Sequence, residues 1–218
     1  MRYGVLGTGM VGQALARRLV GLGHQVRMGA REARNPKAVA FVEEAGELAS
    51  EGRFADAAAF GEVVINATEG TASLDALAAA GADNLAGKIL IDVSNGLVRG
   101  DGLPTLAAVN DDSLGERIQA AFPDARVVKT LNTVNANVMV DPAGRLPETG
   151  NVFLSGDDEA AKQGVAALLE GFGWPQEVIV DLGDITSARG PEMYLALWLR
   201  LWQVRGDLNF NIRVVGSG

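Results

Sequence analysis

Short apolar runs of strand length alternate with segments of helical periodicity along most of the chain. The apolar runs predict strands at residues 3–6, 25–29, 62–67, 88–93, 126–130, 151–155 and 177–181. The other segments predict helices near residues 10–22, 36–46, 71–82, 112–121, 157–171 and 191–205. Strands that alternate with helices need crossover connections, so the pattern predicts an α/β fold with a doubly wound, mostly parallel sheet.

The chain length suits one continuous core with a small appendage, because 218 residues exceed one average domain but fall short of two. Five of the predicted strands precede residue 131, which is enough for a complete core. We therefore predict a core over residues 1–150 and a smaller α/β extension over residues 151–218, partly helical and partly extended, that packs on it. Residues 141–150 are predicted to form a flexible insertion.

The last predicted helix carries an aromatic stripe. Tyr194, Trp198 and Trp202 are four residues apart and share one helix face. We favour core packing or a dimer seam as the explanation, with a ligand-stacking platform as the alternative. The apolar segment 193–204 contains Arg200 and is well below the roughly 20 residues that span a bilayer. No membrane partner is expected, and because the N-terminal apolar run is too short for a signal peptide, the expected location is cytoplasmic.

A glycine-rich turn follows the first predicted strand. The segment Gly7-Thr8-Gly9-Met10-Val11-Gly12 matches G-x-G-x-x-G at the start of a predicted helix. In this pattern the first glycine allows a tight turn, the second lets a pyrophosphate approach the backbone, and the third lets the helix pack closely on the strand. An ordinary glycine turn is the alternative. The order strand, turn, helix and strand favours a Rossmann-type dinucleotide site.

The residues after the second predicted strand bear on which dinucleotide binds. A site for NAD places a carboxylate there to hold the ribose 2′-hydroxyl, whereas a 2′-phosphate needs cations. This position holds Ala30 and Arg31, Arg34 and Lys37 follow, and Glu32 is the nearby acid. The pattern favours NADP(H). A solvated charged loop and NAD binding through Glu32 are the alternatives.

Small and neutral polar residues follow the next three strands of the predicted core. The carboxyl ends of parallel strands meet at one edge of a sheet, where doubly wound folds bind ligands. Amide and hydroxyl groups there suit hydrogen bonds to a ribose, a carboxamide or a flat ring, although the same residue types also form ordinary turns. The candidate cofactor-binding residues at these ends are Ala67, Thr68, Ser94, Asn95, Thr130, Asn132 and Thr133.

Composition removes several kinds of chemistry. The chain has no cysteine and one histidine, His24, which excludes thiolate nucleophiles and cysteine or multi-histidine metal sites. His24 is expected in the turn before the second strand, at the opposite edge of the sheet from the site. Lys129 remains either an acid or base candidate or a solvated or ion-paired side chain. We predict no catalytic side chain and no metal ligand, since hydride transfer between two bound rings needs position more than proton chemistry.

Charge is distributed unevenly along the chain. The net charge of −8 gives no overall attraction for nucleic acid, so no such partner is expected. Residues 17–37 contain six basic residues and one acid, a local net charge of +5. A basic island in an acidic protein is what an anionic cofactor site would produce.

The chain resembles the NADPH-dependent reductases of the deazaflavin coenzyme F420 and their relatives, the reductase domains of the STEAP ferric reductases. The resemblance covers nearly the whole chain, and its motifs are residues 1–12, 21–24, 29–31, 128–133, 156–158, 181–183 and 188–189. It implies NADP(H) held by the segment from Thr8 to Val11, with Arg31 on the 2′-phosphate. It also implies a second flat redox cofactor, F420 or a flavin, near residues 129–135, direct hydride transfer, and a homodimer with contacts from the C-terminal helices.

The predicted function is therefore that of an NADP(H)-dependent oxidoreductase that passes hydride between NADPH and a deazaflavin or flavin-type small-molecule acceptor. The core over residues 1–150 would bind NADP, and the extension over residues 151–218 would contribute to dimerisation. Two alternatives remain. An imine or β-hydroxyacid reductase shares the glycine turn but needs a larger helical C-terminal region than the residues after 190 provide. A non-catalytic redox sensor would bind NADP(H) without turnover.

Overall fold

The computed structural model describes residues 1–216 and contains a central sheet of eight strands. The strands lie in the order β10-β9-β8-β5-β4-β1-β2-β3. All neighbours pair in parallel except β8 and β9, which are antiparallel. The predicted α/β fold with a mostly parallel sheet is thus confirmed. The strands are β1 (Arg2–Leu6), β2 (Gln25–Ala30), β3 (Ala49–Arg53), β4 (Val63–Asn66), β5 (Ile89–Asp92), β8 (Arg126–Thr130), β9 (Val152–Ser155) and β10 (Ile179–Asp181).

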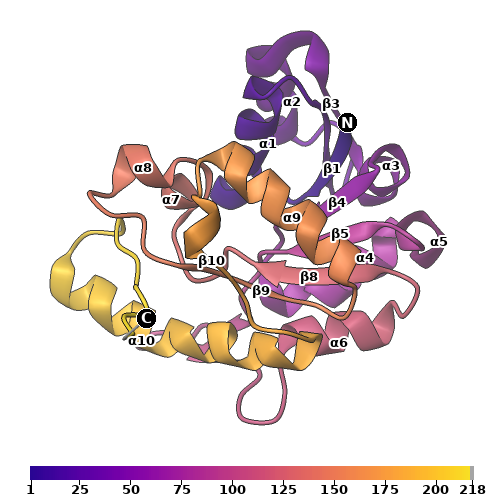
Figure 1. Cartoon of the computed structure of the whole chain (residues 1–218). Helices are drawn as coiled ribbons and strands as arrows, with labels where there is room; N and C mark the ends of the chain where they lie inside the picture. Colours follow the sequence, from indigo (N-terminus) through magenta and orange to yellow (C-terminus); the bar gives the residue numbers. More distant parts are fainter. Residues whose placement is uncertain (217–218) are drawn as a thin grey trace.

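Helices cover both faces of the sheet (Figure 1). On one face, strand residues such as Val5 and Ile65 belong to the same buried apolar cluster as Leu15 and Val165 from the helices. Successive strand residues point to opposite faces, so these strand positions alternate with others that face the second layer. The helices of this face are α1 (Met10–Gly21), α2 (Pro36–Ala45), α7 (Ala136–Val140) and α9 (Glu159–Phe172).

On the opposite face, the intervening strand residues Leu6, Val64 and Leu90 form a second buried cluster with Leu77 and Ile118. Because both faces are covered, the central strands are near-continuous apolar runs, which is why the sequence pattern locates them. The elements of this face are α3 (Phe54–Phe60), α4 (Ser73–Ala80), α5 (Ala82–Leu85), α6 (Leu114–Ala121) and the 3-10 segment η4 (Ile185–Ala188).

The last long helix, α10 (Arg189–Arg205), is followed by a segment that turns back to the body of the protein (Figure 1). Gly206 makes this turn with φ +68°. Asn211 Nδ2 then donates to the Thr149 carbonyl oxygen at 2.7 Å, and the Asn151 N–H donates to the Ile212 carbonyl oxygen at 2.8 Å. The remaining elements are η1 (Gly46–Leu48), η2 (Gly70–Ala72), the hairpin of β6 (Leu97–Val98) and β7 (Thr105–Leu106), α8 (Pro142–Arg145) and η3 (Gln176–Val178).

The structure contains several elements that the sequence-based prediction lacks, among them β3, α3, α7 and the β6-β7 hairpin. β3 is a polar edge strand without an apolar run, so neither it nor the following helix α3 is evident from the hydrophobic pattern. The segment 141–150, predicted to be a flexible insertion, instead contains α8 and is hydrogen-bonded to the C-terminal segment.

The predicted extension shares the central sheet with the predicted core. Its strands β9 and β10 continue that sheet beyond β8, and the boundary at residue 150 stays a prediction. Residues 217–218 of the extension lie outside the described residues. Across residues 1–216, no helix is long and apolar enough to cross a membrane.

Candidate functional site

The turn between β1 and α1 has the geometry that a bound pyrophosphate requires. Gly7 has φ +115°, and a Cβ at Gly12 would lie 2.1 Å from the Gly7 carbonyl oxygen, so glycine lets α1 pack this closely on β1. Gly9, the N-cap of α1, has no neighbouring atom within 4 Å of its Cβ position. This space lies at the end of the helix where the first N–H groups have no intrahelical partners. The three roles expected of the glycines are therefore all present.

An open cavity of about 520 Å³, the Arg31 cavity, begins at this turn. Arg31 directly follows β2 and is exposed, and within residues 1–216 its side chain has no hydrogen-bond or salt-bridge partner. Two acids, Glu69 and Asp75, also line the cavity, together with Phe54 and the end of β4. Arg31 is thus a free cation beside the glycine turn.

The other two predicted phosphate ligands are exposed and do not line this cavity: Arg34 lies on the loop into α2, and Lys37 lies in the first turn of α2. Arg34 has φ +58°, and its backbone N–H donates to Glu51 at 2.8 Å. The Lys37 N–H donates to Asn35, the N-cap of α2, at 3.1 Å. In addition to Glu32, Glu51 is thus a second acid near the predicted phosphate position. The sequence analysis did not identify Glu51 because it lies on β3, a strand that was not predicted.

A second cavity of about 410 Å³, the Trp198 cavity, lies at the carboxyl ends of β4, β5 and β8. Ala67 and Thr68 line both cavities, so the two adjoin along this edge of the sheet, and together they are called the groove. α10 contributes one wall through Trp198 and two leucines. Among the described residues that line this cavity, Arg99 is the only charged one, and none is a histidine, lysine, tyrosine or carboxylate. The cavity therefore suits a largely apolar ring.

Most of the predicted binding residues meet at this groove. Gly12, Ala30, Thr130 and Thr133 are buried and line neither cavity. Thr130 alternates with Lys129 along β8, so its side chain points to the α9 face of the sheet, and its role in cofactor binding stays a prediction. Within residues 1–216, the hydroxyls of Thr130 and Thr133 have no hydrogen-bond partner. The predicted residues that line the groove are Gly7, Thr8, Gly9, Met10, Val11, Arg31, Ala67, Thr68, Ser94, Asn95 and Asn132.

A row of buried polar side chains crosses three strands beside the groove. Asn66, Asp92 and Lys129 are register partners at the ends of β4, β5 and β8, so their side chains share one face of the sheet. Asn66 Nδ2 donates to Asp92 Oδ1 at 2.8 Å, and Lys129 Nζ donates to Asp92 Oδ2 at 2.7 Å. The Thr68 hydroxyl donates to Asn66 Oδ1 at 2.6 Å. This last bond connects the row to a residue that lines both cavities.

Lys129 is ion-paired rather than solvated. Its Nζ lies 2.7 Å from Asp92, 3.0 Å from Glu192 Oε1 and 2.6 Å from the Ser94 carbonyl oxygen, so every ammonium proton has an acceptor. Burial would by itself lower the pKa of Lys129, but the two carboxylates outweigh it and hold the pKa above its ordinary value. Glu192 also accepts from two backbone N–H groups at the start of α6, at 2.7 and 2.9 Å. The ion-paired interpretation of Lys129 is thus confirmed.

Sequence reasoning missed this network and the α10 wall. Asp92 is simply the last residue of an apolar strand in the sequence, and Glu192 lies far along the chain from both partners. The aromatic stripe predicted on the last helix indicated part of this wall. Trp198 packs against Trp202 and Phe210, with ring centroids 6.4 and 5.2 Å apart, and it also lines the cavity. Trp198 therefore takes part in aromatic packing, and the alternative of a ligand-stacking platform stays a prediction.

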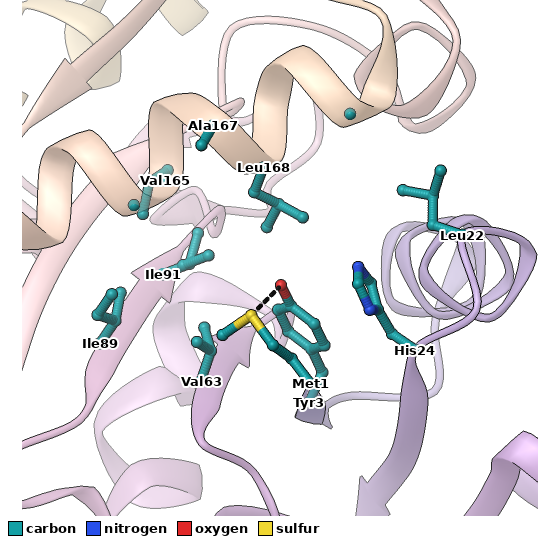
Figure 2. Close-up of a pocket in the computed structure, with 12 residues that line it drawn as sticks. Met1, Tyr3, Leu22, His24, Val63, Ile89, Ile91, Val165, Ala167 and Leu168 are labelled. Atoms are coloured by element: carbon teal, nitrogen blue, oxygen red, sulfur yellow. Dashed lines mark hydrogen bonds between the residues drawn. The ribbon is translucent and has the colours of Figure 1, made fainter.

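A third cavity, of about 360 Å³, lies at the amino ends of the strands (Figure 2). Apolar side chains from the strands and from α9, including Ile91 and Leu168, form most of its wall. His24 lies here, in the turn before β2, with its ring centroid 5.1 Å from that of Tyr3. The single histidine is therefore at the opposite edge of the sheet from the groove, as predicted.

Comparisons with known proteins specify the family. Residues 2–96 match the family described as NADP oxidoreductase, coenzyme F420-dependent. A crystal structure from Arthrobacter sp. FB24, provisionally named as an F420-dependent NADP reductase, is 49% identical over 99% of both chains, with a TM-score of 0.91. The metalloreductase STEAP3 of Rattus norvegicus is 34% identical over 209 residues, which are 93% of this chain and 38% of the rat protein. A reductive aminase from Aspergillus terreus is 20% identical, with a TM-score of 0.65 over 94% of this chain and 62% of its own, and this likeness shows the fold alone.

The fold and the groove define a dinucleotide-binding protein of the Rossmann class. The comparisons go further: the chain belongs to the family of F420-dependent NADP oxidoreductases. This confirms both the resemblance seen in the sequence and the prediction of an NADP-dependent oxidoreductase. The chain spans 38% of the length of the STEAP3 relative.

Proposed function

We propose that the protein transfers hydride between NADPH and a flat redox acceptor, which is the deazaflavin F420 or a flavin. The observation that carries the proposal is that the Arg31 and Trp198 cavities adjoin and share Ala67 and Thr68 as lining residues. A dinucleotide along this edge would place its pyrophosphate at the N-terminus of α1 and its nicotinamide end toward the Trp198 cavity.

The residues of the Arg31 cavity fit an NADP phosphate group. The first turn of α1 contains no acidic residue, so its free N–H groups and positive dipole end are available to the pyrophosphate. Arg31 has five N–H donors without internal partners among residues 1–216, and a guanidinium binds a phosphate in a bidentate way. In this proposal Arg31 contacts the 2′-phosphate, while Arg34 and Lys37 contribute positive charge from the neighbouring loop.

The Trp198 cavity supports transfer between two rings without a side-chain acid or base. Bound NADPH supplies the hydride, and the protein holds the rings together and excludes water. The floor of the cavity is fixed by a reciprocal pair: Asn95 Nδ2 donates to the Asn132 carbonyl oxygen at 2.9 Å, and Asn132 Nδ2 donates to Asn95 Oδ1 at 3.1 Å. With the Trp198 indole in the wall, a planar heteroaromatic acceptor fits the chemistry of this cavity best.

An imine or β-hydroxyacid reductase needs a group that exchanges a proton with the substrate. The described residues that line the Trp198 cavity include no such group besides amides and hydroxyls, and Lys129 lines neither cavity. These observations favour the flat-ring acceptor over that alternative.

We also propose a homodimer with contacts from α10. Leu197 and Val204 on this helix are 54% and 86% exposed, and Trp202 and Leu208 are each 39% exposed. Exposed apolar residues grouped in this way, on α10 and at Leu208 just after it, are typical of an interface. Light scattering over a series of protein concentrations tests it: a dimer mass is expected, and a monomer mass at every concentration would refute it.

The test of the proposed activity is NADPH oxidation, followed by absorbance, with F420, FMN, FAD and a ferric chelate as separate acceptors. Turnover is expected with F420 or with a flavin. NADPH binding without oxidation by any of the four would refute the acceptor assignment and favour the redox-sensor alternative.

A further inference from the structure

Asp92, Lys129 and Glu192 form a buried, ion-paired cluster between β5, β8 and α10. Their side chains are 0%, 0% and 7% exposed, and the cluster contains two carboxylates for one ammonium. Removing charges from water is costly, and an apolar cluster of similar volume is often at least as stable. The excess negative charge is offset by the N–H groups of α6 that Glu192 accepts from. The cluster also contacts two parts of the Trp198 cavity.

One side of the cluster holds the floor of the Trp198 cavity. Lys129 Nζ donates to the Ser94 carbonyl oxygen at 2.6 Å, and the Ser94 hydroxyl donates to Asp92 Oδ1 at 2.6 Å. Ser94 and the next residue, Asn95, both line the cavity. The backbone of this floor is therefore tied directly to Lys129 and Asp92.

The other side of the cluster holds the wall. Glu192 lies on the buried face of α10 together with Leu195 and Leu199, which are one and two turns further along. Both leucines line the Trp198 cavity. A second bond, from Asn132 Nδ2 to the Pro191 carbonyl oxygen at 3.0 Å, fixes the start of the same helix to the floor.

We propose that Lys129 is a positioning residue, which with Asp92 and Glu192 sets the separation between the floor and the α10 wall of the Trp198 cavity. This inference rests on the proposed function, because that separation decides how closely the nicotinamide and the acceptor ring stack. Lys129 does not exchange a proton with either ring, since it lines neither cavity. It acts through Ser94 and Glu192.

The experiment compares Lys129→Met and Glu192→Gln with a matched control, Lys162→Met. Lys162 is also a buried, doubly ion-paired lysine, 2.8 Å from Asp181 and 3.2 Å from Glu159, but it lies on α9 and lines neither cavity. Glu192→Gln keeps the size of the side chain and one oxygen acceptor for α6, which makes it the variant more certain to fold. All are prepared as the full chain.

Two readouts separate positioning from a general loss of structure. The first is the single-turnover rate of hydride transfer per bound NADPH, with saturating acceptor, which does not depend on the folded fraction. The second is the affinity for 2′,5′-ADP, which probes the Arg31 cavity alone, set against the affinity for NADPH. Small misplacements of reacting groups can lower rates by up to about a hundredfold, so a loss of at least about tenfold is expected for both cluster variants. Their 2′,5′-ADP affinity and all properties of Lys162→Met are expected to match the wild type.

A transfer rate per bound NADPH within twofold of the wild type in Glu192→Gln and in any folded Lys129→Met would overturn the inference. If the wild-type protein reduces none of the acceptors, the proposed function fails instead. In that case the affinities of the variants for NADPH and 2′,5′-ADP test the inference. Displaced floor and wall residues should weaken the binding of NADPH more than the binding of 2′,5′-ADP. Equal effects on the two ligands would overturn it.

Discussion

Replacement of Arg31 with alanine tests which chemical group the end of β2 binds. Arg31 is exposed, lines the same cavity as Gly7 and Thr8, and has no internal partner among residues 1–216. Its removal therefore breaks no contact within the protein. Any loss of nucleotide affinity in this variant is then due to the lost contact between Arg31 and the nucleotide.

The expected magnitude follows from the type of bond. A hydrogen bond between charged groups contributes about 1.5–3 kcal/mol. Because Arg31 is exposed and its charge is screened by salt, we expect the lower part of this range, about 1.5–2 kcal/mol. This corresponds to a roughly tenfold to thirtyfold increase in the Kd for NADPH. NADH lacks the 2′-phosphate, so its Kd should stay nearly unchanged.

The assay is titration of both nucleotides into the wild type and Arg31→Ala at low and moderate salt. Arg17→Ala is the matched control, because Arg17 belongs to the same basic segment but pairs with Glu44 at 2.8 Å and lines neither cavity. This control should bind both nucleotides normally. Equal losses of NADPH and NADH affinity in Arg31→Ala would refute the assignment of Arg31 to the 2′-phosphate.

Three further predictions concern the glycine turn, the acceptor cavity and the pH dependence of stability. Gly12→Ala places a Cβ 2.1 Å from the Gly7 carbonyl oxygen, so it should cost about 1–3 kcal/mol in unfolding free energy and weaken NADPH binding; an unchanged Tm and Kd would contradict this. Trp198→Ala removes the aromatic wall and should raise the acceptor KM about twofold to tenfold with little change in the NADPH Kd, whereas a loss confined to NADPH would place the acceptor elsewhere. The Arg189 guanidinium beside Glu116 holds the pKa of that carboxyl below its ordinary value. The ion pair therefore stabilises the fold fully above the unfolded-state pKa of Glu116, and this stabilisation is lost as the pH falls through the folded-state pKa. Glu116→Gln should therefore be less stable than the wild type near neutral pH, and the difference should shrink as the pH falls below the unfolded-state pKa and through the lowered folded-state pKa; denaturant titrations that show a constant difference from neutral to acidic pH would rule the linkage out.

The nucleotide-binding half of the groove could be predicted because its signals are local in the sequence. The glycine turn needs specific residues within one short segment, and Arg31 follows at the end of the next apolar strand. The central strands could be located because a sheet covered on both faces has apolar residues at successive positions. The edge strand β3 lacks that burial pattern, and Glu51 was missed with it.

The acceptor half could be predicted only in part, because it depends on contacts between distant segments. Nothing near Lys129 in the sequence indicates that Glu192 completes its ion pairs. Thr130 was expected at the groove from its place at a strand end, but the alternation of side chains along β8 directs it to the other face. Trp198 could be identified as part of a stripe, while the cavity beside it needs the fold of α10 against the strand ends.

The central claim is that hydride passes directly between two bound rings without a side-chain acid or base. The most direct measurement is a single-turnover reaction of F420 with NADPH that carries deuterium at the transferred C4 position, from about pH 7 to 9. If transfer is direct, the deuterium is recovered in the reduced deazaflavin and the transfer rate is independent of pH. Loss of the deuterium to solvent, or a bell-shaped pH profile of the transfer step, would contradict it.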